Sequence, residues 1–351
     1  MFAQKRAKHF KLSIKLDFIK RTKSFLELGN SIKNIEPMLL DEVIKKATSE
    51  NPWFTEENIR LSMQGLLHFL EEDTMTAWIN QYDLSRVPSK KIGVVMAGNI
   101  PMVGIHDMIC VLVSGHTLIA KLSSQDEVLI PFIANKLIDI APEFKDKFHF
   151  VDKLKGMDAV IATGSDNSSR YFNYYFSKYP HIIRKNRTSI AILNGKEKPN
   201  ELKALGIDIF SYFGLGCRNV SKIYLPKGYE INALITHFED FKHLTDHNKY
   251  SNNYYYNKSI FLVNNSDHLD CGFALFQQNS KLTSPISVVY YDYYSDIESL
   301  YEELIQLEQK IQCRVSNIEI IENRVKFGKA QMPDIWDYAD NIDTMNFLIN
   351  L

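Results

Sequence analysis

The chain has 351 residues, and 45% of them are hydrophobic, which is enough to bury a core in each of two lobes. Its 41 lysines and arginines nearly balance 42 aspartates and glutamates, so no single-sign field favours nucleic acid or an anionic membrane. The expected partners are small molecules or ordinary proteins, and not nucleic acid.

The amino terminus and the cysteines indicate the compartment. Residues 5–8 are basic, but polar or charged residues interrupt every apolar stretch over 10–16, which fits neither a signal peptide nor a membrane span. The four cysteines lie far apart and form no CxxC pair, which argues against a disulfide framework or a structural zinc site. We expect a cytoplasmic protein without a metal.

The first half of the chain predicts a helical segment followed by a Rossmann-like domain. Residues 1–88 place apolar side chains at helical spacing, and we expect this segment to pack on a dinucleotide-binding domain over 89–197. Strands are expected at 92–97, 117–122, 148–151, 158–162 and 188–193, and helices at 102–113, 127–140 and 167–177. This alternation is typical of a doubly wound parallel sheet.

The second half predicts another α/β lobe, over 198–325, which would carry the catalytic chemistry. Strands are expected at 220–225, 260–263, 286–291 and 317–321, and helices from about 202, at 231–241 and at 297–311. The tail, 326–351, holds Trp336, Tyr338 and Met345 and is too apolar for a disordered terminus. The predicted fold class is therefore α/β, with two doubly wound lobes and an α-helical amino-terminal segment.

Cys217 is the strongest candidate for a nucleophile. It follows Gly214-Leu215-Gly216 directly before an expected strand, so its thiol lies on a turn whose glycines let a substrate approach the backbone. The thiolate is the reactive form, and Arg218 together with oriented backbone N–H groups can lower a thiol pKa. The alternative is that Cys217 only packs, which is what we expect of the other three cysteines.

Asn99 follows the first expected strand, at the carboxyl edge where open α/β sheets bind ligands. Its amide can donate to an oxyanion. With the backbone N–H of Cys217 it would provide two donors for the tetrahedral intermediate of thioester exchange. The alternative is an ordinary turn asparagine before Pro101.

Two further strand ends can hold a dinucleotide. Thr163, Gly164 and Ser165 precede a helix, whose first N–H groups are available to a pyrophosphate. Lys121 ends the second strand and, with Ser123, is placed to reach a ribose or a phosphate. The alternative is a solvated lysine at the end of a strand. Neither GxGxxG nor a P-loop occurs, which excludes the ordinary dinucleotide fingerprint and a Walker site.

Taken in order, these pieces resemble the aldehyde dehydrogenase superfamily: Asn-x-Pro after a strand, Ala-Lys at the next strand end, Thr-Gly-Ser before a helix, and then Gly-x-Gly-Cys. Residues 97–101 and 120–124 look like the acyl-CoA reductase branch, relatives of the fatty acid reductase of bacterial bioluminescence. Residues 334–345 are similar to the end of those proteins. The resemblance covers roughly 85–351 and implies an aldehyde dehydrogenase-like fold with NADPH or NADH as cofactor.

The resemblance also implies roles for individual residues. Cys217 would be the nucleophile and Asn99 the oxyanion donor, while Lys121 would contact the ribose and Gly164 and Ser165 the pyrophosphate. Oxidising members have a glutamate that activates water for hydrolysis of the acyl-enzyme. Ile192 stands at that position here and cannot act as a base.

The expected function is reduction of a fatty acyl thioester, acyl-CoA or acyl-carrier protein, to the aldehyde by NAD(P)H through a thioester on Cys217. One alternative is a CoA-acylating aldehyde dehydrogenase that acts oxidatively. Another is a catalytically degenerate scaffold subunit, which would have no reason to bind a dinucleotide. By analogy with the superfamily, we expect a homo-oligomer or a complex with acyl-transferring enzymes.

Overall fold

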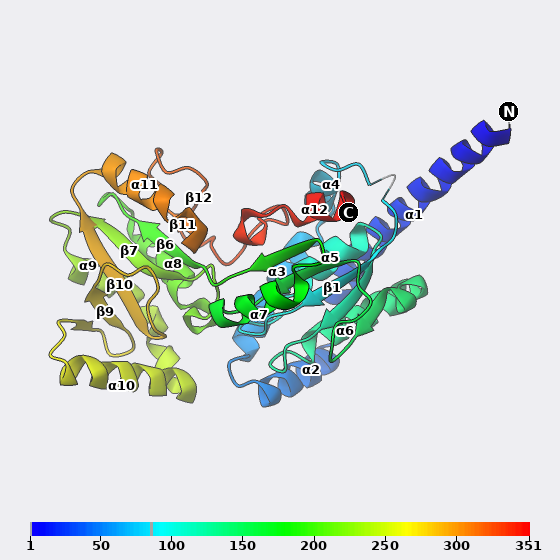
Figure 1. The fold of residues 1–351 in the computed structure, drawn as a ribbon. Coiled ribbons are helices and arrows are strands. Elements are labelled where there is room, and N and C mark those ends of the chain that lie inside the picture. The colour runs from blue at the N-terminus through cyan, green and yellow to red at the C-terminus, as the bar shows by residue number, and fades with distance from the viewer. Residues whose placement is uncertain (1, 85–86) are drawn as a thin grey trace. The chain divides into compact units, whose positions relative to one another are not determined.

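The computed structural model describes residues 2–84 and 87–351, with side chains from residue 18 onward except at 166. It forms two compact units (Figure 1). The first contains residues 1–185 together with 334–351, and the second contains residues 186–333.

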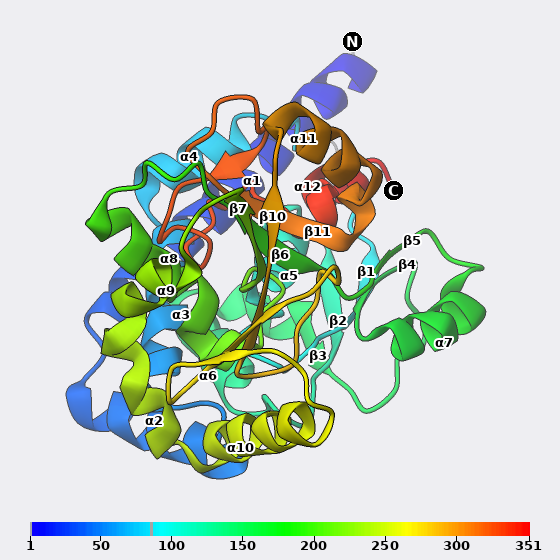
Figure 2. The same cartoon turned by 90° about the vertical axis from the view of Figure 1, so that its left-hand side faces the viewer.

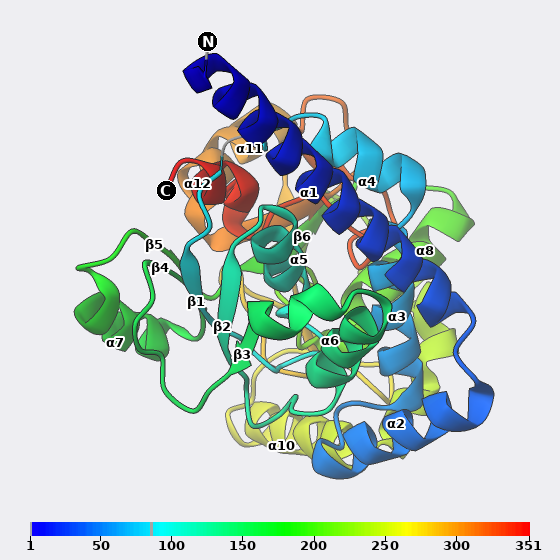
Figure 3. The same ribbon diagram turned by 90° about the vertical axis from the view of Figure 1, so that its right-hand side faces the viewer.

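The first unit is built on a five-stranded parallel sheet in the order β3-β2-β1-β4-β5. The strands are β1 (Lys91–Val95), β2 (Thr117–Lys121), β3 (Phe148–Phe150), β4 (Ala159–Thr163) and β5 (His181–Arg184). The connecting helices are α5 (Ile105–Val113), α6 (Leu129–Ile140) and α7 (Asp166–Phe176), and α7 lies beside β4 and β5 (Figure 3). The central strands are short apolar runs, and burial on both faces explains that composition.

The amino-terminal segment is helical, as predicted. It contains α1 (Phe2–Lys33), α2 (Pro37–Glu50), α3 (Glu56–Phe69) and α4 (Glu72–Ile79). Pro37 begins α2, and the Thr55 hydroxyl caps α3 by accepting from the N–H of Asn58 at 3.3 Å. Helix α1 lies against α3, α5 and α6 (Figure 3), so the segment shares the core of the first unit.

The last part of the carboxyl-terminal tail, residues 334–351, also folds into the first unit, whereas 326–333 belong to the second. Tyr338 accepts a hydrogen bond at 2.7 Å from the indole Nε1 of Trp78, and α12 (Thr344–Ile349) packs on α5. The tail is therefore ordered, as its apolar content predicts. Among the helices that the structure describes, none is both long enough and apolar enough to cross a lipid bilayer.

The second unit contains a seven-stranded sheet in the order β12-β11-β6-β7-β10-β9-β8. Figure 2 labels β6, β7, β10 and β11 of this sheet. Its strands are β6 (Thr188–Ile192), β7 (Val220–Pro226), β8 (Leu269–Asp270), β9 (Leu275–Gln278), β10 (Val288–Tyr294), β11 (Ile311–Val315) and β12 (Arg324–Val325). All pairings are parallel except β8 with β9. The helices are α8 (Pro199–Phe210), α9 (Ile231–Ile235), α10 (Asn248–Val263) and α11 (Ile297–Gln306).

The division between the units differs from the boundary expected at 197. Strand β6 pairs with β7 and β11, so it belongs to the second sheet and not to the first. Ile190 and Ile192 of this strand pack with Leu300 and Leu304 of α11. The sequence of an apolar strand does not indicate which strands it pairs with, so it could not assign β6 to one sheet or the other.

Three elements of the second half correct the sequence expectations. The strand expected at 260–263 is wrong: this apolar stretch is the end of α10, where the N–H of Asn264 still bonds to the carbonyl of Ile260. The strand expected at 317–321 lies at 311–315, because α11 ends at Gln306 and not at 311. The helix expected over 231–241 is α for only its first turn and continues as a 3₁₀ segment over 236–246.

Candidate active site

The first unit brings the predicted cofactor residues and Asn99 to one edge of its sheet. Val95, near the end of β1, pairs with Lys121 of β2 and with Ala162 of β4. Because parallel strands end at the same edge, Asn99, Lys121 and the segment 163–165 all follow at the carboxyl edge. This is the edge at which open α/β sheets bind ligands.

The loops after β1 and β2 are in contact. A Cβ atom placed on Gly98 would lie 2.6 Å from Oγ of Ser123, so only glycine fits there without a shift of the backbone or of Ser123. Asn99 is the next residue, and its side chain is exposed. The structure therefore places the predicted oxyanion donor beside the loop of the predicted ribose contacts.

Asp126 fixes both loops, although no sequence motif points to it. One carboxylate oxygen accepts from the N–H of Met102 at 2.8 Å, and the other accepts from the N–H of Leu129 at 3.3 Å, in the first turn of α6. The side chain is buried, and this burial raises the pKa of the carboxyl to about 6, against the two hydrogen bonds that lower it.

The segment Thr163-Gly164-Ser165 begins α7 as predicted. Oγ of Ser165 caps the helix by accepting from the N–H of Ser168 at 3.2 Å. A Cβ atom on Gly164 would lie 2.8 Å from the ring of Phe172, so the glycine also lets α7 pack closely on the end of β4. The segment therefore has a structural role beside any role in binding a pyrophosphate.

Cys217 lies in the second unit, on the turn that joins α8 to β7. Its side chain is exposed, and its carbonyl accepts a hydrogen bond at 3.0 Å from Oγ of Ser189 in β6. Tyr212, Phe213 and Gly214, which precede the turn, all have a positive φ, between 52° and 76°. Two of these are aromatic residues in a costly conformation, which persists only when the surroundings fix it.

Asn219 holds this turn closed. Its buried Oδ1 accepts from the N–H of Gly216 at 2.8 Å. Its Nδ2 lies within hydrogen-bonding distance of three carbonyl oxygens at the end of α8, those of Asp208, Ile209 and Ser211, at 3.3, 3.2 and 2.8 Å. The asparagine thus ties both sides of the turn to the preceding helix, and Cys217 is presented on a rigid loop.

Arg218 and Asp208 connect the same turn to the segment after β12. Nε of Arg218 donates to the carbonyl of Ala330 at 2.6 Å. The Asp208 carboxylate accepts from the N–H groups of Gly328 and Ala330, at 2.6 and 2.9 Å. Asp208 is fully buried, and burial raises its pKa to about 7 although both hydrogen bonds and Arg218 lower it.

A small cavity of about 30 Å³ lies behind the Cys217 turn. Phe213, Gly214, Asn219, Tyr250 and the segment 284–289 contribute to its lining. The hydroxyl of Tyr250 is buried and has no hydrogen-bond partner among the described residues, and burial raises its pKa. The sequence did not point to this cavity, because neither Tyr250 nor the segment 284–289 forms a recognisable motif.

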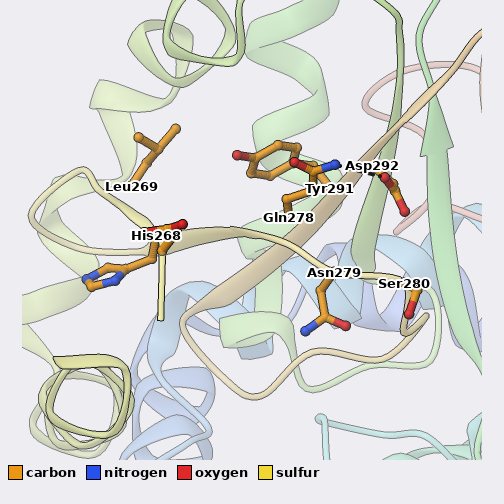
Figure 4. A pocket seen from close by; sticks show the side chains of 8 residues that line it. His268, Leu269, Gln278, Asn279, Ser280, Tyr291 and Asp292 are labelled. Carbon is orange, nitrogen blue, oxygen red and sulfur yellow. Dashed lines mark hydrogen bonds between the residues drawn. The ribbon is translucent and has the colours of Figure 1, made fainter. Parts of the chain in front are cut away.

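A larger cavity of about 660 Å³ opens in the second unit, at the end of β9 and beside the middle of β10 (Figure 4). It is lined by Asp267, His268, Leu269, Gln278, Asn279, Ser280, Tyr291 and Asp292. Asp292 of β10 pairs with Tyr224 of β7. Tyr224 is four residues after Val220, the first residue of β7, and at about 3.3 Å per residue it lies roughly 13 Å along the strand. The Asp292 carboxylate already pairs with the buried Lys222 ammonium at 3.5 Å. We assign no chemistry to this cavity, despite its size, because it lies far along β7 from the Cys217 thiol, which precedes the start of that strand.

The predicted nucleophile and its predicted partners thus lie in different units. Asn99, Lys121, Ser123 and 163–165 are together in the first unit, whereas Cys217 is in the second. Their joint geometry stays a prediction. Within the described residues, no group of three or more histidine, cysteine or acidic side chains could hold a metal ion.

Comparison with known proteins gives a family match over the segment that contains the predicted site residues. Residues 71–234 match the acyl-CoA reductase (LuxC) family, and this range contains every predicted site residue from Asn99 to Cys217. A UDP-N-acetylmuramate–L-alanine ligase of Prochlorococcus marinus is 33% identical over 70 residues. These are 20% of this chain and only 14% of the ligase, which is too little for a functional argument.

Solved structures share the fold. Aldehyde dehydrogenase 21 from Physcomitrella patens, in complex with succinate, matches with a TM-score of 0.68 and 10% sequence identity. The match covers 95% of this chain and 84% of the dehydrogenase chain. Aldehyde dehydrogenases of Mycobacterium tuberculosis and Bacillus cereus, both in complex with NAD+, each have a TM-score of 0.61. Their sequences are 11% and 12% identical to this chain. Each match covers 85% of this chain, and it covers 72% of the first enzyme and 71% of the second. At these identities the likeness establishes the aldehyde dehydrogenase fold, as predicted.

Proposed function

We propose that the protein reduces a fatty acyl thioester to the aldehyde through a thioester on Cys217, because residues 71–234 match the acyl-CoA reductase (LuxC) family, an oxidoreductase family. The observation that carries the choice of nucleophile is the position of Cys217. Its side chain is exposed on a turn that Asn219 closes, within the residues that match the family. Cys110 and Cys313 are buried, and Cys271 is half-buried with a pKa raised mainly by burial, so none of them is a comparable candidate.

In the first step the Cys217 thiolate attacks the thioester carbonyl. A carbon–sulfur bond forms to Cys217, the bond to the donor sulfur breaks, and the departing thiolate takes a proton from solvent. The Asn99 amide and the N–H of Cys217 are the proposed donors to the oxyanion. Exchange between thioesters is nearly isoenergetic, so this step needs no strong base. Ile192, which stands where oxidising relatives have a water-activating glutamate, is buried in β6.

A nicotinamide cofactor, NADPH or NADH, supplies a hydride when bound, and the carboxyl edge of the first sheet fits such a group. Lys121 and Ser123 are the proposed ribose contacts. The pyrophosphate would be held by Thr163, Gly164 and Ser165 at the start of α7, where first-turn N–H groups lack intrahelical partners. Lys121 and Ser165 are exposed, and Gly98 has no side chain that would displace the loop of Ser123.

The remaining expectations are part of the proposal. The acyl donor is acyl-CoA or an acyl-carrier protein, and the working form is a homo-oligomer or a complex with an acyl-transferring enzyme. We propose the cytoplasm as the compartment, because none of the four cysteines, all of them in the described part, forms a disulfide.

The test is the loss of NADPH or NADH absorbance when the purified protein is mixed with a long-chain acyl-CoA. We expect oxidation of the cofactor that disappears in Cys217→Ala and persists in Cys271→Ala, whose native thiol donates to the carbonyl of Ala274. Full activity in Cys217→Ala would exclude the scheme. Absence of oxidation with either cofactor, of the reverse reaction with aldehyde and CoA, and of any acyl-enzyme by mass would favour the scaffold alternative.

A further inference from the structure

A closed set of hydrogen bonds surrounds the turn that carries Cys217. Asn219 joins the turn to the carbonyl of Asp208 in α8, and the Asp208 carboxylate accepts from Gly328 and Ala330. The carbonyl of Ala330 in turn accepts from Arg218, which is the residue after Cys217. Both ends of the turn are therefore anchored to one residue, through Asn219 to the backbone carbonyl of Asp208 and through Arg218 and Ala330 to its carboxylate.

We propose that Asp208 is a positioning residue for Cys217, which holds the reactive turn through the segment 328–330. This inference rests on the proposed role of Cys217 as the nucleophile. Asp208 does not touch the thiol or a substrate. Its carboxylate acts through the segment 328–330 and Arg218, whereas Asn219 bonds to the backbone carbonyl of Asp208.

The geometry requires an ionised carboxylate. Two backbone N–H groups, those of Gly328 and Ala330, point at the two oxygens of Asp208. A protonated carboxyl would direct its O–H at one of these donors, and that hydrogen bond would be lost. The segment 328–330 would then loosen, and the anchor of Arg218 with it.

Protonation near neutral pH is accessible to this group. Burial raises the Asp208 pKa to about 7, and Arg218 is the charged side chain that acts against this among the described residues. The hydrogen-bonded arrangement therefore holds above about pH 7 and weakens below it. The charge of Asp208 has the opposite effect on the reactivity of Cys217. When Asp208 is neutral, the positive charge of Arg218 is no longer compensated, and this favours a nearby thiolate.

The experiment follows alkylation of Cys217 by iodoacetamide between pH 6 and 9 in the full chain, with each cysteine quantified by peptide mass. The variants are Asp208→Asn, which keeps the shape but removes the charge and one acceptor, and Asp208→Ala. Asp126→Asn is the matched control, because Asp126 is also a buried carboxylate with two backbone N–H donors but lies in the first unit. Thermal unfolding identifies any variant that fails to fold.

In the native protein we expect the alkylation profile of Cys217 to contain a second inflection near pH 7, beside that of the thiol itself. In Asp208→Asn this inflection should vanish, and above pH 7 the rate should fall by about tenfold, the factor for one lost hydrogen bond to a charged group. In reductase assays kcat should fall while KM is unchanged. Asp126→Asn should leave the alkylation profile unchanged.

Two results would overturn the proposal. One is a native rate and profile in Asp208→Asn. The other is faster alkylation in that variant, which would mean that Asp208 acts on the thiol only through its charge. Because alkylation uses neither acyl substrate nor cofactor, it decides the positioning role separately from the proposed function, which the Cys217→Ala reductase assay decides.

Discussion

The guanidinium of Arg184, at the end of β5, forms a bidentate ion pair with the carboxylate of Asp107 in α5, at N···O distances of 2.7 and 2.9 Å. Both side chains are buried. Arg184 also donates to the hydroxyls of Thr344 and Thr163, at 2.8 and 3.4 Å. One buried cation thus joins α5, β5, the carboxyl-terminal helix and the strand end of the predicted pyrophosphate site.

Removing one partner of this ion pair should destabilise the first unit strongly. Asp107→Ala leaves the Arg184 charge buried without its counterion, which costs roughly 3–5 kcal/mol in comparable cases. The exposed pair of Arg60 with Glu56 is the control, and Arg60→Ala should cost less than about 1 kcal/mol. All three tryptophans, at 53, 78 and 336, lie in the first unit, so urea unfolding followed by tryptophan fluorescence reports on it. Equal losses in the two variants would contradict this expectation.

The strands of the two sheets differ in how well the sequence predicted them. Strands β1 to β4 were expected within about two residues, because buried parallel strands are short apolar runs with clear ends. The sheet that contains β6, the strand β5 and the helical end of α10 were missed. Each of these depends on contacts with distant segments, which override the local pattern.

The same distinction applies to the site. Asn99, Lys121, 163–165 and Cys217 could be selected because each follows or precedes a strand at a turn. The groups that hold those turns could not be selected. Asp208 bonds to the N–H of Ala330, 122 residues away, and Asp126 and Arg184 likewise act through partners that no short motif specifies.

Asp126 should make the stability of the first unit depend on pH. Its pKa is raised by burial from 3.8 to about 6, so the folded state binds a proton more tightly than the unfolded state. The stabilisation from this group is complete below pH 4 and is lost as the pH rises through 6, by about 3 kcal/mol for two pKa units. Urea unfolding at pH 4.5, 5.5 and 7 should show the stability difference between native protein and Asp126→Asn shrinking as the pH rises. A difference that is constant with pH would exclude this assignment.

Gly98 should be required for binding of the cofactor. In Gly98→Ala the new methyl group would meet Ser123 at 2.6 Å and displace the loop of the proposed ribose contacts. We expect the KM for NADPH or NADH to rise several-fold. Gly65→Ala is the control, since a methyl group there meets nothing within 4 Å in α3. An unchanged KM in Gly98→Ala would show that this loop is not part of the cofactor site.

Two tyrosines of α10 allow a matched test of the cavity behind Cys217. The Tyr250 hydroxyl is buried without a partner among the described residues, whereas the Tyr254 hydroxyl donates to Asp270 at 2.6 Å. Tyr250→Phe removes an unsatisfied polar group and should leave stability unchanged or raise it by up to about 1 kcal/mol, whereas Tyr254→Phe should lower it by about 1 to 2 kcal/mol. Differential scanning calorimetry measures both. A clear loss of stability in Tyr250→Phe would mean that a bound water satisfies this hydroxyl, because a cavity of about 30 Å³ has room for one.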